Sequence, residues 1–161
     1  PVLRNKFPNY KSYATATMAS VLSSEEQKRA AISEAELMDR CIFYNDGKGD
    51  FKQQFLPDNA QWSPVQDILV SDLNNNSRPD LIIIGNAYDT EPATSGFHGA
   101  SVGLILLNKS DGRFTSHLYQ ETGFIANGDN KSIISINSPK GKTRYIISQN
   151  SDKLLIYEKN N

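Results

Sequence analysis

The residues with the clearest chemistry are oxygen-bearing side chains at positions 1, 3, 5 and 9 of a short segment, residues 72–80. Alternate residues of a tight loop can turn inward around one ion, and Ca²⁺ takes about six to eight oxygen ligands. Arg78, in the middle of the pattern, can offer only its backbone carbonyl. The spacing therefore predicts a calcium site formed by Asp72, Asn74, Asn76, Arg78 and Asp80.

Two departures from the usual calcium loop limit this prediction. Ser77 stands where glycine normally permits a positive φ, and Asp72 and Asp80 are the only charged ligands. Because affinity follows ligand charge, we expect a weak site, with a Kd of roughly 10⁻⁴–10⁻³ M. The alternative is an Asn-rich turn that side-chain-to-backbone hydrogen bonds hold without an ion. Ile83 replaces the bidentate glutamate of an EF-hand, so that motif is rejected.

Short strands must position this loop. From residue 41 onward, apolar residues alternate with polar ones and turn residues separate the runs, which predicts an antiparallel, mainly β fold. Residues 65–71 and 81–85 flank the loop. The other expected strands are residues 41–45, 51–56, 103–108, 114–118, 132–137, 144–149 and 154–157.

Helical spacing characterises the first 40 residues instead. Apolar residues recur at steps of three and four, and Asn9 is a good N-cap for a helix that reaches about residue 22. Ser23 and Glu26 form a capping-box pattern, which predicts a second helix of sixteen residues. Residues 1–40 are therefore expected to be a helical insertion before the β region, residues 41–161.

Two segments of the β region resemble each other and suggest a repeat. Residues 43–51 and 106–114 both contain two apolar residues, an asparagine, a turn with Asp-Gly and then a phenylalanine. Residues 67–85 resemble an FG-GAP/VCBS repeat, the blade unit of integrin-α-type β-propellers. Residues 56–65, 85–92 and 103–107 are similar to the C-terminal part of large bacterial VCBS-repeat proteins of the ASPIC/UnbV type.

The resemblance implies a partial β-propeller of antiparallel four-stranded blades with an N-terminal helical insertion. One blade would end in residues 41–56, a second would span 63–118 and a third 130–158. The family also implies calcium in loops between strands, a secreted or outer-cell-surface location in bacteria, and no shared catalytic residues. The chain starts at Pro1 without a signal peptide, so we expect a piece of a larger propeller whose remaining blades, or self-association, cover its open edges.

Composition excludes several functions. The formal net charge is −1, which argues against nucleic-acid binding. No apolar run approaches the roughly 18 residues of a membrane span. No nucleophile elbow, Walker loop or dinucleotide motif is present. Asp89, Glu91 and His98 could form a second metal or acid–base cluster, but their spacing matches no ligand pattern and equally fits a solvated loop.

The function expected from the sequence is therefore non-catalytic. We expect a calcium-associated extracellular binding or scaffold module that recognises a protein or a glycan. The alternative is part of a propeller-type polysaccharide-degrading enzyme of the lyase kind. A lyase requires convergent Lys, Arg, Tyr or His side chains on one face, whereas a binding module requires exposed aromatic side chains.

Overall fold

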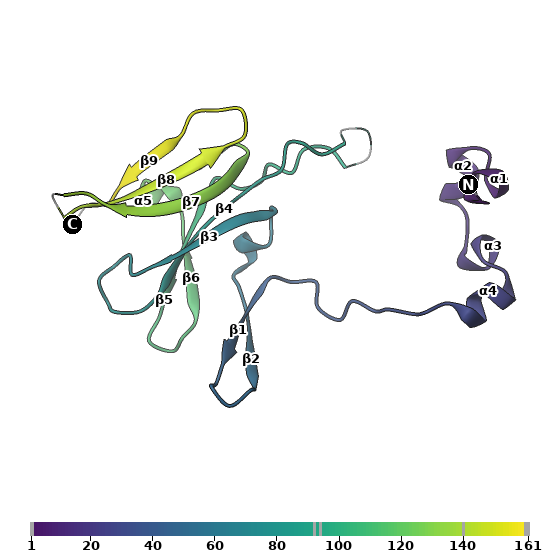
Figure 1. Cartoon of the computed structure of the whole chain (residues 1–161), viewed down its shortest axis with the longest axis horizontal. Coiled ribbons are helices and arrows are strands. Elements are labelled where there is room, and N and C mark those ends of the chain that lie inside the picture. Colours follow the sequence, from purple (N-terminus) through teal and green to yellow (C-terminus); the bar gives the residue numbers. More distant parts are fainter. Residues whose placement is uncertain (1, 92, 94, 140, 160–161) are drawn as a thin grey trace. The chain divides into compact units, whose positions relative to one another are not determined.

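A computed structural model describes residues 2–91, 93, 95–139 and 141–159 (Figure 1). Three residues named or implied in the sequence analysis lie outside the described residues: Pro1, Pro92 at the end of segment 85–92, and Lys140 in the turn expected between residues 137 and 144. The chain divides into two compact units, Pro1–Met38 and Asp39–Asn161. The first is helical and the second is built from antiparallel sheets, so the prediction of a mainly β chain with a helical start is confirmed.

The helical unit contains four short helices where the sequence predicted two longer ones: α1 (Val2–Lys6), α2 (Tyr10–Ala14), α3 (Met18–Val21) and α4 (Ser24–Arg29). The predicted caps are present. Asn9 Oδ1 accepts the Ser12 N–H at 2.9 Å, and Ser23 Oγ accepts the Glu26 N–H at 3.3 Å.

The predicted helix lengths are wrong for a physical reason. No buried side chain is found among the described residues of α2, α3 and α4, so tertiary packing does not extend them. The Thr15 hydroxyl donates to the Lys11 and Ser12 carbonyls, and Thr17 starts a new cap by donating its N–H to Ser20 Oγ at 3.0 Å. After α4 the backbone is extended at Ala30, and residues 30–38 are exposed.

A β-hairpin opens the β unit. Strands β1 (Cys41–Asn45) and β2 (Phe51–Phe55) pair antiparallel from Cys41 opposite Phe55 to Asn45 opposite Phe51. The Asp46 carboxylate accepts the Lys48 N–H at 2.7 Å within the turn. The short 3₁₀ helix η1 (Asp58–Ala60) follows.

The central sheet has four antiparallel strands in sequence order: β3 (Val65–Ser71), β4 (Asp80–Gly85), β5 (Leu104–Asn108) and β6 (Phe114–His117). The predicted loop connects β3 to β4, which pair from Val65 opposite Gly85 to Ser71 opposite Asp80 with one bulge. The turn-like helix α5 (Tyr119–Thr122) then leads to a second sheet of three strands, β7 (Asn130–Asn137), β8 (Thr143–Gln149) and β9 (Leu155–Glu158).

Two hydrophobic clusters occupy opposite faces of the central sheet. The inter-sheet cluster lies between the two sheets and contains Ile82, Ile84, Phe124, Ala126, Ile133, Tyr145 and Ile147. The second cluster contains Leu56, Ala60, Leu81, Ile83, Leu104 and Leu106. Because successive β4 side chains point to opposite faces, this strand contributes to both clusters and is buried along its whole length.

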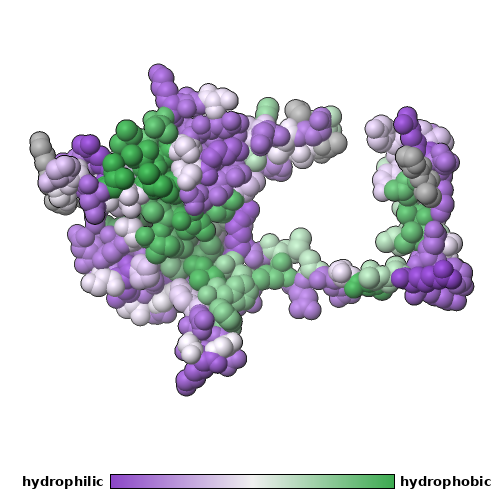
Figure 2. Space-filling view, viewed as in Figure 1, coloured by the Kyte–Doolittle hydropathy of each residue, from purple (hydrophilic) through white to green (hydrophobic). Residues whose placement is uncertain are grey.

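The other face of the β7–β9 sheet is apolar but uncovered in the described chain. Ile134, Ile146 and Ile156 lie opposite one another across the three strands. Ile134 is 53% and Ile156 62% exposed, and Figure 2 shows hydrophobic residues gathered over this sheet. Exposed apolar area of this extent is typical of an interaction surface.

Candidate functional site

The predicted calcium loop is ordered by its own side-chain oxygens. Asp72 Oδ1 accepts the Asn76 N–H at 3.0 Å, and Oδ2 accepts the Ser77 N–H at 2.7 Å. Burial raises the pKa of Asp72, but hydrogen bonds from the backbone amides of Ser77, Asn76, Asn75 and Asn74 outweigh it, so the pKa lies below its ordinary value. The Asp72 carboxylate is therefore held ionised inside the loop.

The two predicted asparagine ligands also accept backbone N–H groups of the loop. Asn74 Oδ1 accepts the Asn76 N–H at 3.2 Å, and Asn76 Oδ1 accepts the Arg78 N–H at 2.8 Å. The guanidinium of Arg78 donates to the Asn108 carbonyl at 3.3 Å, on β5. Ser77 adopts φ +62°, so the conformation that glycine would favour is present although serine occupies the position.

Asp80 joins the loop to the neighbouring strand. It is completely buried, and its two oxygens accept the Leu73 N–H at 2.8 Å and the Asn108 N–H at 2.7 Å. Asn108 Oδ1 is also buried and has no hydrogen-bond partner in the described part of the chain. The structure therefore brings Asp72 and Asp80 to one loop, with a further unpaired oxygen beside it.

Every predicted ligand offers an oxygen atom, the donor type that a hard cation takes, but both oxygens of Asp72 and both of Asp80 already accept backbone N–H groups. The ammonium group of Lys159 opposes cation binding, because it places a positive charge at the loop. Its Nζ donates to Asn75 Oδ1 at 2.8 Å and to the Asp72 carbonyl at 3.2 Å. Groups of three or more His, Cys, Asp or Glu side chains able to hold a metal ion are not found among the described residues. The loop has two carboxylates, and its hydrogen bonds equally suit the ion-free turn.

A second candidate site is a hollow of about 690 Å³, here called the aromatic depression. It is lined by Trp62, Tyr88, Phe97, His98, Gly99 and Ala100. Trp62 is 66% and Phe97 69% exposed, although large aromatic side chains usually bury much of their surface. Tyr88 and Phe97 form an edge-to-face pair with ring centroids 5.8 Å apart.

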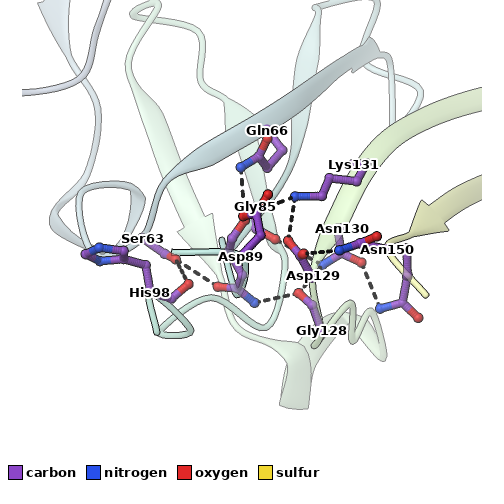
Figure 3. A network of polar contacts seen from close by, with 12 residues as sticks. Ser63, Gln66, Gly85, Asp89, His98, Gly128, Asp129, Asn130, Lys131 and Asn150 are labelled. Carbon is purple, nitrogen blue, oxygen red and sulfur yellow. Dashed lines mark hydrogen bonds and ion pairs between the residues drawn. The ribbon is translucent and has the colours of Figure 1, made fainter. Parts of the chain in front are cut away.

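Buried polar contacts fix the long loop that carries this depression. Asn86 is completely buried with φ +81°. Its Oδ1 accepts from the Ser63 hydroxyl at 2.8 Å and the Ser101 N–H at 2.9 Å, while its Nδ2 donates to the Ser101 and Gly128 carbonyls at 2.8 Å each. The Ala87 and His98 backbones exchange two further hydrogen bonds. Asn86 thus joins both ends of the loop to Ser63 and Gly128; Figure 3 shows Ser63 and Gly128 within this network.

An ion pair continues this network toward β7. The Asp129 carboxylate is buried and accepts from Lys131 Nζ at 2.8 Å and from Asn150 Nδ2 at 3.1 Å. Burial raises its pKa, but Lys131, Asn150 and the Tyr88 backbone N–H together lower it below its ordinary value. Asp129 therefore joins Lys131 of β7 to Asn150, the residue after β8 (Figure 3).

Asp89, Glu91 and His98 are not brought together as a metal group among the described residues. Asp89 lies 3.9 Å from Lys131 Nζ, and His98 lines the aromatic depression.

Sequence reasoning did not identify the aromatic depression as a site. Trp62 precedes β3 and the other aromatic residues follow β4, so their proximity depends on the β3–β4 pairing. One feature of the sequence could have predicted this site: its aromatic residues occur in turn-rich segments, which usually lie at the surface.

Comparisons with known family models, with curated proteins and with solved structures find no match for this chain. In the part that the structure describes, the helices are all too short and too polar to cross a bilayer.

Proposed function

We propose that this chain is a non-catalytic, calcium-associated binding module on the outer surface of a bacterial cell, and that it recognises a protein or a glycan through the aromatic depression. The observation that carries the proposal is the exposure of Trp62, which precedes β3, and of Phe97, which lies on the loop whose two ends Asn86 joins by hydrogen bonds to Ser101. Rigidly presented aromatic side chains are the usual anchors of binding interfaces, because their contact area costs little conformational entropy.

The proposed architecture is part of a β-propeller. Two features support it: two antiparallel sheets pack through the inter-sheet cluster, and the opposite face of the β7–β9 sheet is apolar and exposed. In this proposal further blades, or a second copy of the chain, cover that face. The 72–80 loop would bind calcium weakly and stiffen the β3–β4 connection.

The proposed binding function is tested by screening the chain against a printed glycan array and a display library of extracellular protein fragments. For any ligand found, Trp62→Ala should weaken binding at least about tenfold, because aromatic anchors commonly contribute 2 kcal/mol or more. Phe51→Ala is the matched control, since Phe51 is 61% exposed on β2, outside the depression. Equal binding by the Trp62 variant and the original chain would refute the proposed site.

Part of a polysaccharide lyase remains a second candidate, because Tyr88 and His98 both line the aromatic depression. The same glycans therefore need incubation with the chain, followed by analysis for unsaturated products. Cleavage that Tyr88→Phe abolishes, while binding persists, would replace the binding proposal by the enzymatic one.

A further inference from the structure

Strand β9 leaves one edge of the second sheet open. The central sheet has four strands, whereas the second ends at β9 in the described chain. The Lys159 N–H donates to the Thr143 carbonyl at 3.0 Å. Because antiparallel neighbours alternate in direction, this contact places the N–H and C=O groups of Ile156 and Glu158 toward the open edge.

The edge strand is only four residues long and ends in Glu158, which pairs with Lys142 and Arg144, but it lacks other devices against strand pairing. The strand reads Leu-Ile-Tyr-Glu without proline or glycine, and its pairing with β8 contains no bulge. Charged lysines lie outside the strand, at positions 153 and 159. An unbulged edge with apolar residues at most of its positions can pair with another strand.

A groove of about 560 Å³ lies beside this edge, between the two sheets. Apolar side chains from the central sheet and the inter-sheet cluster line it, namely Leu73, Ile82, Ile105, Leu107, Phe124 and Tyr145, together with Tyr157 of β9. Its position next to β5, β6 and β9 is where the inward side chains of a fourth strand would lie, since alternate residues of an added strand point to the same face.

The groove also contains an unexplained polar atom. Tyr145 is 5% exposed, and its buried hydroxyl has no hydrogen-bond partner among the described residues. A buried hydroxyl without a partner is unfavourable. An incoming polypeptide could supply an acceptor after a small movement of the ring.

Charged side chains line the same groove: Glu121 and Glu158, whose carboxylates already contact His117 and the Lys142 and Arg144 pair, and Lys159. The two contacts of the Lys159 ammonium group are with neutral oxygens of Asp72 and Asn75. Within the described residues Lys159 has no carboxylate partner, so a carboxylate at the end of an incoming strand would complement it.

We propose that β9 and this groove accept an extended strand from a partner polypeptide by strand addition. The strand pairs with the Ile156 and Glu158 backbone groups and places apolar side chains at alternate positions in the groove. An acidic residue at one end pairs with Lys159. This interface is separate from the aromatic depression and does not depend on the proposed function.

The probe is a synthetic peptide that copies residues 112–119, with an aspartate added at each end. These residues include β6, which fills the fourth position of the central sheet, where Phe114 and Ser116 share one face. Added to the full chain, the peptide should slow amide hydrogen exchange at Ile156 and Glu158 about tenfold or more. The control peptide carries Ser116→Pro, which removes a backbone donor.

Variants of the chain test the same interface. Ile156→Pro should abolish the protection of Glu158, because it removes a donor that faces the edge and leaves the β8 ladder intact, whereas Ile156→Thr should retain it. Lys159→Gln should weaken peptide binding several-fold. If Ile156→Pro does not fold, the proline peptide and Lys159→Gln still decide the question.

Three results would overturn the proposal. The first is equal protection by the proline peptide, which indicates apolar adhesion without strand pairing. The second concerns a fusion of the strand after Asn161 through a Gly-Ser linker, which gives the strand a high effective concentration. No protection and an unchanged melting temperature in this fusion would refute strand addition. The third is protection that grows with protein concentration without peptide, which assigns the edge to a second copy.

Discussion

Asp67 on β3 joins the central sheet to β7 by hydrogen bonds. Its Oδ2 accepts the Ile133 N–H at 2.8 Å and the Ser132 hydroxyl at 2.9 Å on β7, and its Oδ1 accepts the Ile68 N–H at 2.8 Å. Burial raises the pKa of Asp67, but these three donors outweigh it and lower the pKa below its ordinary value near 3.8. The folded state therefore favours the ionised carboxylate.

The first prediction follows from the sign of this shift. A carboxyl with a lowered folded pKa contributes stability that is fully present above its unfolded pKa and is lost as pH falls through the folded value. Asp67→Asn should therefore reduce the free energy of unfolding by about 1 kcal/mol at neutral pH. The difference from the original chain should shrink below about pH 4.

Urea denaturation at several pH values measures this effect. Asp152→Asn, an exposed turn aspartate, is the control and should change stability little. A deficit of the Asp67 variant that stays constant down to pH 2 would mean that the carboxylate charge is not its cause.

At the scale of elements, the strands were far more predictable than the helices. Residues 41–45 and 65–71 form strands with the predicted ends, and the other seven differ by one or two residues. Alternation and turn residues determine these elements because sheet burial enforces the same pattern. The helices at residues 9–38 had correct caps but no buried face, so local caps alone could not predict their length.

The 72–80 loop shows the same limit at a site. Its pattern of oxygens predicted a calcium site or an ion-free turn. The side chains of Asp72, Asn74, Asn76 and Asp80 accept backbone N–H groups, which both predictions allow. The approach of Lys159 could not be predicted, because this residue directly follows β9 of the other sheet. The local sequence pattern also could not predict that Trp62 and Phe97 lie near each other, since this depends on the pairing of β3 with β4.

The second prediction concerns this loop. Millimolar calcium should raise the melting temperature of the chain relative to a sample with chelator, because an ion that binds only the folded loop stabilises it by mass action. Asp72→Ala should abolish the difference, and Asp152→Ala should retain it. Differential scanning calorimetry provides the measurement. A melting temperature indifferent to calcium would leave the loop as an ion-free turn.

For the whole molecule, β4 is the strand on which both hydrophobic clusters depend. Ile82 and Ile84 face the inter-sheet cluster, while Leu81 and Ile83 face the second cluster. A substitution that disrupts one cluster should therefore also weaken the other cluster, because both clusters depend on the backbone of β4. We expect the two sheets to unfold together.

The third prediction tests this coupling. Ile84 is completely buried, so Ile84→Ala should reduce the free energy of unfolding by about 2–5 kcal/mol. Amide exchange should accelerate in β4, β5 and β8 alike. Ile134→Ala makes the same change on the exposed face and should cost about 0.5 kcal/mol or less. Faster exchange confined to β7–β9 would show that the sheets unfold independently.

The exposure of Trp62 has a practical consequence for spectroscopy. The chain contains one tryptophan, and its indole lies in the aromatic depression, outside both hydrophobic clusters. Its fluorescence emission therefore reports the solvent around that hollow and changes little when the sheets come apart. Unfolding has to be followed by circular dichroism, which leaves the indole signal free to detect the arrival of a ligand.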